Sequence, residues 1–212
     1  MTRNIETPRR AYRIRLAAVV LCLLVPLSVP ADLVVRCNLA DLQRDAGTVF
    51  HGRCIERKEV RDAQPLPYVE YTFEVTEALK GCRGADGKPL RRIRFRHVLD
   101  RPARRLPDGT IQVPLRFGVA RYAVGETRVL FLTEESELGL CAPVGLDQGA
   151  FVVREKANRR VVTNRFGNRH LFEGLPAEST RRVDRARLRA AREAGAELAL
   201  DRFLEISRSL EK

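Results

Sequence analysis

The stretch YVEYTFEVTEAL at residues 68–79 decides the fold of this chain. Its apolar residues Val69, Tyr71, Phe73 and Val75 alternate with polar residues. Alternation with a period of two places the apolar side chains on one face of a strand and the polar side chains on the other. The stretch therefore predicts a half-buried β-strand, and it is the clearest strand in the sequence.

Further strands are predicted on both sides of this one. Residues 48–60 contain β-branched and aromatic residues, and Gly52 among them suits a bulge or a tight corner. Residues 127–133 are almost wholly apolar, which predicts a central strand that is covered on both faces. The other expected elements are a strand at 91–98, a short strand near 111–113, a hairpin of 145–154 and 160–166, and a short helix within 34–46 that presents Val35, Leu39 and Leu42.

Short antiparallel strands without a regular alternation of strands and helices predict a mainly β domain, which we expect to be a small closed antiparallel barrel. From residue 180 onward the sequence is rich in Arg, Ala, Glu and Leu and lacks proline. This composition predicts one helix, or two helices broken at Gly195, after the barrel. Leu200, Phe203 and Leu204 give its last turns an apolar face that can pack on the barrel.

The N-terminal residues have the features of a secretory signal. Five arginines precede an apolar run at 16–27, and small residues lead up to Ala31. A membrane-spanning helix needs roughly 20 apolar residues, so the run predicts cleavage before Asp32 and a secreted or periplasmic protein. An uncleaved anchor is the alternative. The chain is then divided into a signal at 1–31, a β-domain at 32–175 and a C-terminal helical segment at 176–212.

The charge of the chain raises the question of an anionic partner. It has 39 basic and 27 acidic residues, and without the signal the numbers are 34 and 26, a net charge of +8. Alternation over 91–98 predicts a strand with arginines along one face, and arginine forks suit phosphate and carboxylate oxygens. Hydrated arginines without a partner are the alternative. The candidate binding residues are Arg91, Arg92, Arg94, Arg96, Arg101, Arg104 and Arg105.

The cysteines predict disulfides. Cys22 belongs to the signal, and Cys37, Cys54, Cys82 and Cys141 remain. An even number of cysteines in an exported chain indicates two disulfides, and the lack of a Cys-x-x-Cys pair argues against a zinc site or a redox pair. Three pairings are possible. Closeness along the chain favours Cys37–Cys54, which leaves Cys82–Cys141.

Several short motifs follow one another in a characteristic order: Cys37, AGTVFHG at 46–52, YTFEVTEALKG at 71–81, VGETRVLFL at 124–132 and GLDQGAF at 145–151. The order resembles that of exported bacterial proteins of unassigned activity, and of the netrin-like and tissue-inhibitor-of-metalloproteinase module. The resemblance covers residues 37–155. It implies an OB-type, five-stranded Greek-key barrel with flanking helices, and disulfides that tie down the N-terminal segment.

The inhibitory chemistry of that module depends on the start of the chain. In those inhibitors the mature chain begins with a cysteine whose amine and carbonyl chelate the zinc of the protease. Here the expected first residue is Asp32, and Cys37 lies five residues further on. Zinc chelation is therefore not expected, and protease inhibition stays an alternative.

Motifs of common enzyme classes are missing from the sequence. It contains no Gly-x-Ser-x-Gly, His-Glu-x-x-His or phosphate-loop pattern. The three histidines, His51, His97 and His170, are expected to be two strand residues and one loop residue rather than metal ligands. We expect no catalytic activity, no metal and no cofactor.

Export and the lack of an aromatic residue on the arginine face of the strand at 91–98 argue against a nucleic acid partner, because single-stranded nucleic acids are bound by stacking as well as by charge. The sequence therefore favours a non-catalytic binding module for another envelope or extracellular protein. The first alternative is an anionic envelope polymer or lipid head group, bound through the arginine face. The second is protease inhibition.

Overall fold

The computed structural model describes residues 35–63, 66–99, 104–105, 107–112, 120–175, 189 and 198–211. The expected signal and cleavage site lie outside the described residues. So does most of the C-terminal segment before residue 198, including Gly195.

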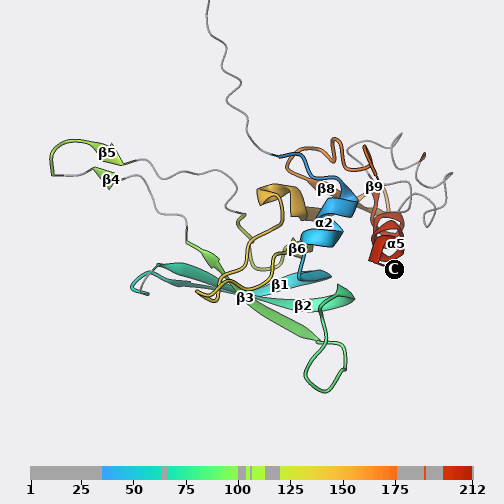
Figure 1. Cartoon of the computed structure of the whole chain (residues 1–212), viewed down its shortest axis with the longest axis horizontal. Coiled ribbons are helices and arrows are strands. Elements are labelled where there is room, and N and C mark those ends of the chain that lie inside the picture. The colour runs from blue at the N-terminus through green and yellow to red at the C-terminus, as the bar shows by residue number, and fades with distance from the viewer. Residues whose placement is uncertain are drawn as a thin grey trace, which may run out of the picture. The chain divides into compact units, whose positions relative to one another are not determined.

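The elements are labelled in Figure 1 and follow one another along the chain. They are α2 (Leu39–Asp45), β1 (Thr48–Val60), β2 (Tyr68–Lys80), β3 (Arg92–Val98), β4 (Arg104–Arg105), β5 (Ile111–Gln112), β6 (Thr127–Leu132), the 3-10 helix η1 (Leu146–Gly149), β7 (Ala150–Lys156), β8 (Arg159–Asn164), β9 (Leu198–Ala199) and α5 (Leu200–Glu211).

Most of the described strands form one antiparallel sheet. Its seven strands have the order β3-β2-β1-β6-β7-β8-β9, and β4 and β5 pair separately. Within the sheet, β6, β1, β2 and β3 have the spatial order 4-1-2-3 of a Greek key. The mainly β class predicted from the sequence is confirmed, as are the short helix before β1 and the helix at the C-terminal end.

The sheet is not closed, so the predicted closed barrel is not supported. Strands β3 and β9 end the strand order, and no ladder among the described residues joins β3 to β7. β7 instead pairs with β6 over residues 150–152 along one edge and with β8 over residues 151–156 along the other. A single backbone bond, from the N–H of Cys141 to the carbonyl of Arg96 (2.8 Å), links the β6–β7 connection to β3.

Strand β6 separates two apolar clusters. Val129 and Phe131 belong to the first cluster, which α2 and α5 cover, and Leu130 and Leu132 belong to the second. All four side chains are at most 1% exposed. The prediction that this strand is covered on both faces is therefore confirmed.

Aromatic rings fill the second cluster. Tyr71 and Phe73 of β2 contact Tyr122, with ring centroids 4.8 and 5.6 Å away, and Phe95 of β3 lies 5.9 Å from Phe73. Val69 is buried on the same face of β2, as the alternation predicted. Because the residues come from β2, β3 and the segment before β6, the cluster holds the curved part of the sheet together.

Gly52 lets β1 and β2 approach each other closely. The pairing of the two strands shifts register between His51 and Gly52, where the sequence predicted a bulge. A Cβ atom at Gly52 would lie 2.5 Å from the carbonyl oxygen of Glu74. Any larger residue at this position would therefore separate the two strands.

The two described α-helices meet the expectations in part. Leu39 and Leu42 of α2 are buried, but Val35 precedes the helix and is 80% exposed, so its place on the helical face was wrong. In α5, Phe203 and Leu204 are buried in the first cluster, as predicted. Strand β9, which pairs with β8, was not predicted, because two residues are too few to show a pattern.

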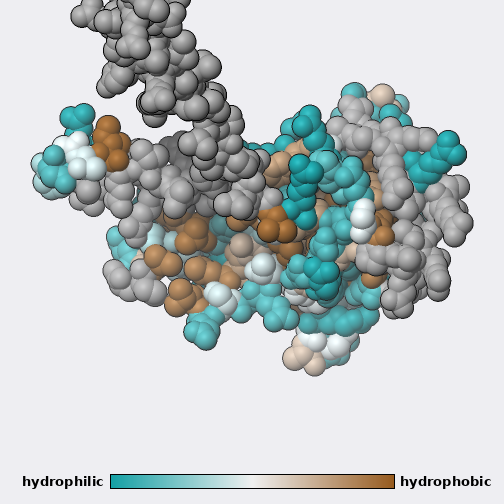
Figure 2. Space-filling view, turned by 45° about the horizontal axis from the view of Figure 1, so that its top comes forward, coloured by the Kyte–Doolittle hydropathy of each residue, from teal (hydrophilic) through white to brown (hydrophobic). Residues whose placement is uncertain are grey.

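Apolar and hydrophilic residues both reach the surface, and Figure 2 shows them together on one face. Among the described residues, no helix is both long and apolar enough to span a membrane. The large apolar side chains that are exposed come from different loops and elements: Val35, Leu66, Leu90, Ile111, Val124, Leu138, Leu146 and Phe166.

We predict that Phe73→Ala destabilises the protein by roughly 3–5 kcal/mol, because the truncation leaves a cavity inside the aromatic cluster. Leu138→Ala is the matched control, since Leu138 is 52% exposed. Its effect should stay within about 0.5 kcal/mol. Urea unfolding of the two variants measures both values, and equal effects would show that the cluster is not the core.

Candidate functional site

Strand β3 alternates as its sequence predicts. Ile93, Phe95 and His97 are buried, whereas Arg92, Arg94 and Arg96 are exposed. The three arginines therefore lie in a row on the outer face of the sheet, which we call the arginine row. Its backbone is fixed from the inside, because Ile93 and Phe95 belong to the second apolar cluster.

Two members of the arginine row have an acidic partner on β2. The Nε atom of Arg96 lies 3.2 Å from one carboxylate oxygen of Glu70, and that of Arg94 lies 3.8 Å from the other. The guanidinium of Arg96 also lies over the ring of Tyr68, at 4.9 Å from its centroid. Glu70 thus neutralises part of the positive charge of the arginine row, which the sequence analysis had treated as unpaired.

The rest of this outer face mixes both charges. Register pairs Glu74 with Arg92 and with Arg53, and pairs Glu70 with Lys58. Sequence reasoning placed Glu70 and Glu74 on the polar face of their strand but missed that they face the arginines. The alternation of each strand shows that the glutamates of β2 and the arginines of β3 lie on polar faces. Only the register of β2 with β3 shows that these side chains are neighbours.

The backbone of the arginine row lies along the outer edge of β3, with which no described strand pairs. The N–H of Val75 bonds to the carbonyl of Arg91 and the N–H of Leu99 to that of Pro67, so odd-numbered residues of β3 bond to β2. The backbone groups of even-numbered residues therefore point away from β2. Among the described residues, the N–H of Cys141 bonds to one of these outward groups, the carbonyl of Arg96.

The remaining predicted arginines are not all brought to this site. Arg91 is exposed and directly precedes β3. Arg101 lies outside the described residues, and Arg104 and Arg105 belong to β4, on the separate pair of strands. The structure therefore brings together Arg92, Arg94 and Arg96 of the seven candidates, and Arg91 adjoins them only along the chain.

The histidines do not form a site. His51 on β1 and His97 on β3 are each 3% exposed, and His170 lies in a turn, as expected. Burial lowers the pKa of both strand histidines, and the charge of Arg160 lowers that of His51 further. No group of three metal-ligating side chains occurs among the described residues.

The predicted disulfides are not formed in this structure, where Cys37, Cys54, Cys82 and Cys141 all have free thiols. Cys37 packs against the first apolar cluster, whereas Cys54 belongs to the second. A disulfide between Cys37 and Cys54, the favoured pair, would therefore have to link two separate clusters. Cys82 donates to the carbonyl of Val49. Burial raises the pKa of all four thiols.

The backbone of Cys37 is held by Gln148. The N–H of Cys37 donates to the side-chain oxygen of Gln148 (2.9 Å), and the side-chain NH₂ of Gln148 donates to the carbonyls of Val35 and Gly145. The N-terminal segment is thus tied to the connection before β7 by hydrogen bonds.

Comparisons with known proteins gave no relative of this chain: no family model, no curated protein and no solved structure matches it.

We predict that the stability of the protein falls as the pH drops below about 6.5, partly through His51. Its pKa is lowered in the folded state, so between that pKa and about 6.5, the usual value, the unfolded state binds more protons than the folded state. His51→Gln should therefore flatten the dependence of the unfolding free energy on pH between about 6.5 and 5. The replacement of His170, which is half-exposed, serves as the control.

We predict that iodoacetamide modifies Cys37 and Cys141 before Cys54 and Cys82 in the native protein. The first two are partly exposed and the last two are buried, and a thiol must be accessible and deprotonated to react. Mass spectrometry of the digested protein identifies the modified residues. Resistance of all four to modification until a reductant is added would instead confirm the disulfides predicted from the sequence.

Proposed function

We propose that this chain is an exported, non-catalytic binding module that takes an extended acidic segment of another envelope or extracellular protein along the free edge of β3. The observation that carries the proposal is the coincidence of that edge with the arginine row. Free strand edges bind extended peptides through backbone hydrogen bonds, while side chains supply specificity. Here the specificity would be for carboxylates.

The geometry of β3 supports this mode of binding. The outward backbone groups of Arg92 and Arg94 lie beside their own exposed side chains, and the buried Ile93 and Phe95 hold the strand in place. A partner strand with an acidic residue at every second position would face the arginines along the row. Arg92 forms no ion pair with any described residue, so it is the first residue we assign to the partner.

We further propose that the fold is of the partly open OB type, as in the netrin-like module. The Greek-key order of β6, β1, β2 and β3 supports this assignment, since the OB fold is a five-stranded, partly open Greek-key barrel. A partly open sheet retains the edge that the proposed binding needs. Export, which the proposal assumes, rests on the sequence of residues 1–31.

The test compares two variants of one residue. The probe is a synthetic peptide of alternating glutamate and valine, and its binding is measured by calorimetry. Arg94→Gln removes a charge and should weaken binding about threefold to tenfold. Arg94→Pro removes the same charge and also the outward N–H, so it should weaken binding roughly fivefold further, the worth of one hydrogen bond.

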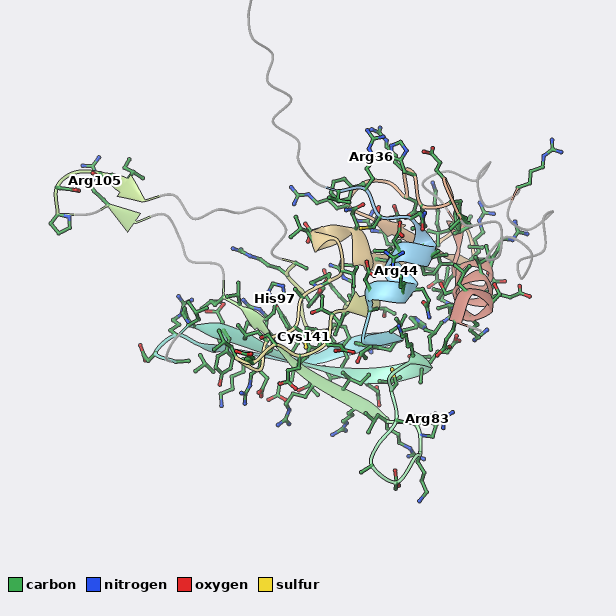
Figure 3. The ribbon with its side chains drawn as sticks, viewed as in Figure 1. Arg36, Arg44, Arg83, His97, Arg105 and Cys141 are labelled. Carbon is green, nitrogen blue, oxygen red and sulfur yellow. The ribbon has the colours of Figure 1, made fainter. Side chains whose placement is uncertain are left out.

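The controls separate strand addition from attraction by charge. Arg83→Gln changes an exposed arginine on the β2–β3 loop, away from the row, and should bind the peptide as the unchanged protein does (Figure 3). Thermal unfolding shows whether Arg94→Pro is folded. Equal binding by Arg94→Pro and Arg94→Gln would contradict strand addition and favour an anionic polymer or lipid head group, and equal effects of Arg94→Gln and Arg83→Gln would contradict the site.

A further inference from the structure

The connection between β6 and β7 is an acidic hairpin. Residues 133–144 have the sequence TEESELGLCAPV, with three glutamates and no basic residue. At its base, the N–H of Thr133 donates to the carbonyl of Ala142 (2.9 Å). Nearer its tip, the N–H of Ser136 donates to the carbonyl of Leu140 (3.0 Å). We call residues 133–144 the acidic hairpin.

The returning arm of the acidic hairpin lies against the outer edge of β3. The N–H of Cys141 donates to the carbonyl of Arg96 (2.8 Å), one of the backbone groups that point away from β2. Figure 3 shows Cys141 beside this strand. A backbone N–H is also the group that the proposed acidic partner would supply at the same place. The hairpin therefore already occupies one position of the proposed peptide edge.

The acidic hairpin also brings a carboxylate close to Arg96. A Cβ atom at Gly139 would lie 3.2 Å from a carboxylate oxygen of Glu135 and 3.9 Å from Nη1 of Arg96, so both side chains lie close to Gly139. The pKa of Arg96 is raised mainly by its hydrogen bond to Glu70, and the charge of Glu135 adds to the increase. The hairpin thus supplies a backbone donor and a negative charge, the two groups that the proposed partner would use.

The hairpin is anchored at its base rather than at β3. Pro143 and Val144 are buried, whereas residues 134–138 are exposed. Among the described residues, one backbone hydrogen bond joins the hairpin to β3. Segments with few buried contacts open at a low cost in free energy. The outer part of the hairpin can therefore leave β3 while its base stays in place.

We infer that the acidic hairpin is an autoinhibitory contact, which competes with the acidic partner for the C-terminal end of the β3 edge. This role of the hairpin rests on the peptide edge proposed above. While the hairpin is in place, the partner reaches the outward backbone groups of Arg92 and Arg94 only. Displacement of the hairpin extends the edge to Arg96 and Val98. The hairpin therefore weakens the binding of long acidic segments and leaves that of short segments unchanged.

Two capped peptides of alternating glutamate and valine are the probes, one of about four residues and one of about eight. Strands pair residue by residue, and β3 has seven residues. The short peptide therefore fits beside Arg92 and Arg94, whereas the long peptide reaches Arg96 as well. Calorimetry on the full chain measures the binding of each peptide.

Two variants separate the backbone contact of the hairpin from its charge. In the first, Asn-Gly replaces residues 134–141, which removes the outer hairpin and keeps the pairing of Thr133 with Ala142, because Asn-Gly favours a two-residue turn. The matched control combines Glu134→Gln, Glu135→Gln and Glu137→Gln, which removes the same three charges and keeps the bond to β3. Thermal unfolding shows whether both variants are folded.

The variant with Asn-Gly should bind the long peptide about fivefold more tightly than the control does, the worth of one hydrogen bond position made available. The two variants should bind the short peptide equally. Equal binding of the long peptide, or weaker binding by the variant with Asn-Gly, would show that the hairpin does not compete for the edge and would overturn the inference.

Hydrogen exchange measured by NMR follows the displacement directly. The amide of Cys141 should be protected in the unbound protein, because it donates to Arg96. It should exchange faster when the long peptide is bound. The amide of Thr133, at the base of the same hairpin, is the control and should stay protected. Protection of Cys141 that persists in the complex with the long peptide would also overturn the inference.

Two results separate an error about the hairpin from an error about the peptide edge. If neither peptide binds to the unchanged protein or to either variant, the peptide edge itself is contradicted. If the short peptide binds, but the two variants bind the long peptide equally and Cys141 stays protected, the peptide edge stands and the autoinhibitory role of the hairpin is contradicted.

Discussion

Strand β7 has β6 on one edge and β8 on the other, and this double pairing is the constraint on which the rest of the structure depends. β7 is paired with these two strands, and among the described residues no ladder joins it to β3. The sheet then stays open, and side chains rather than a ladder hold its curved part together. The ring of Tyr122, packed between Tyr71 and Phe73, supplies much of that contact.

The open sheet has two consequences for binding. No described strand pairs with the outer edge of β3, and the arginines Arg128 and Arg154 lie on the face of β6 and β7 beyond Ala150. Arginines therefore occur in two places. Arg92 and Arg94 lie on the edge strand β3, and Arg128 and Arg154 line a cavity over β6 and β7. Charged side chains on an edge strand also discourage unwanted pairing between chains, and the arginine row has this effect on β3.

Alternation allowed β2, β3 and β6 to be predicted from the sequence, because a strand with one buried face shows a period of two and a strand with two buried faces is apolar throughout. Arg92, Arg94 and Arg96 could therefore be assigned to one face in advance. Glu70 could not be assigned to them, since pairing between strands depends on register. Arg128, Arg154 and Arg165 line one cavity of about 460 Å³, and they were missed for the same reason. They are far apart along the chain, and no local sequence pattern groups them.

The sequence by itself determined the mainly β class, the buried faces of the strands and the helices at both ends of the described domain, because these follow from local periodicity. Only the tertiary structure decided that the sheet is open, that Glu70 faces the arginine row and that Arg128, Arg154 and Arg165 line one cavity. These features depend on which strand edges pair and in which register, and such pairings join residues far apart along the chain. Local patterns of hydropathy assign side chains to the faces of a strand, but they do not specify which strands pair.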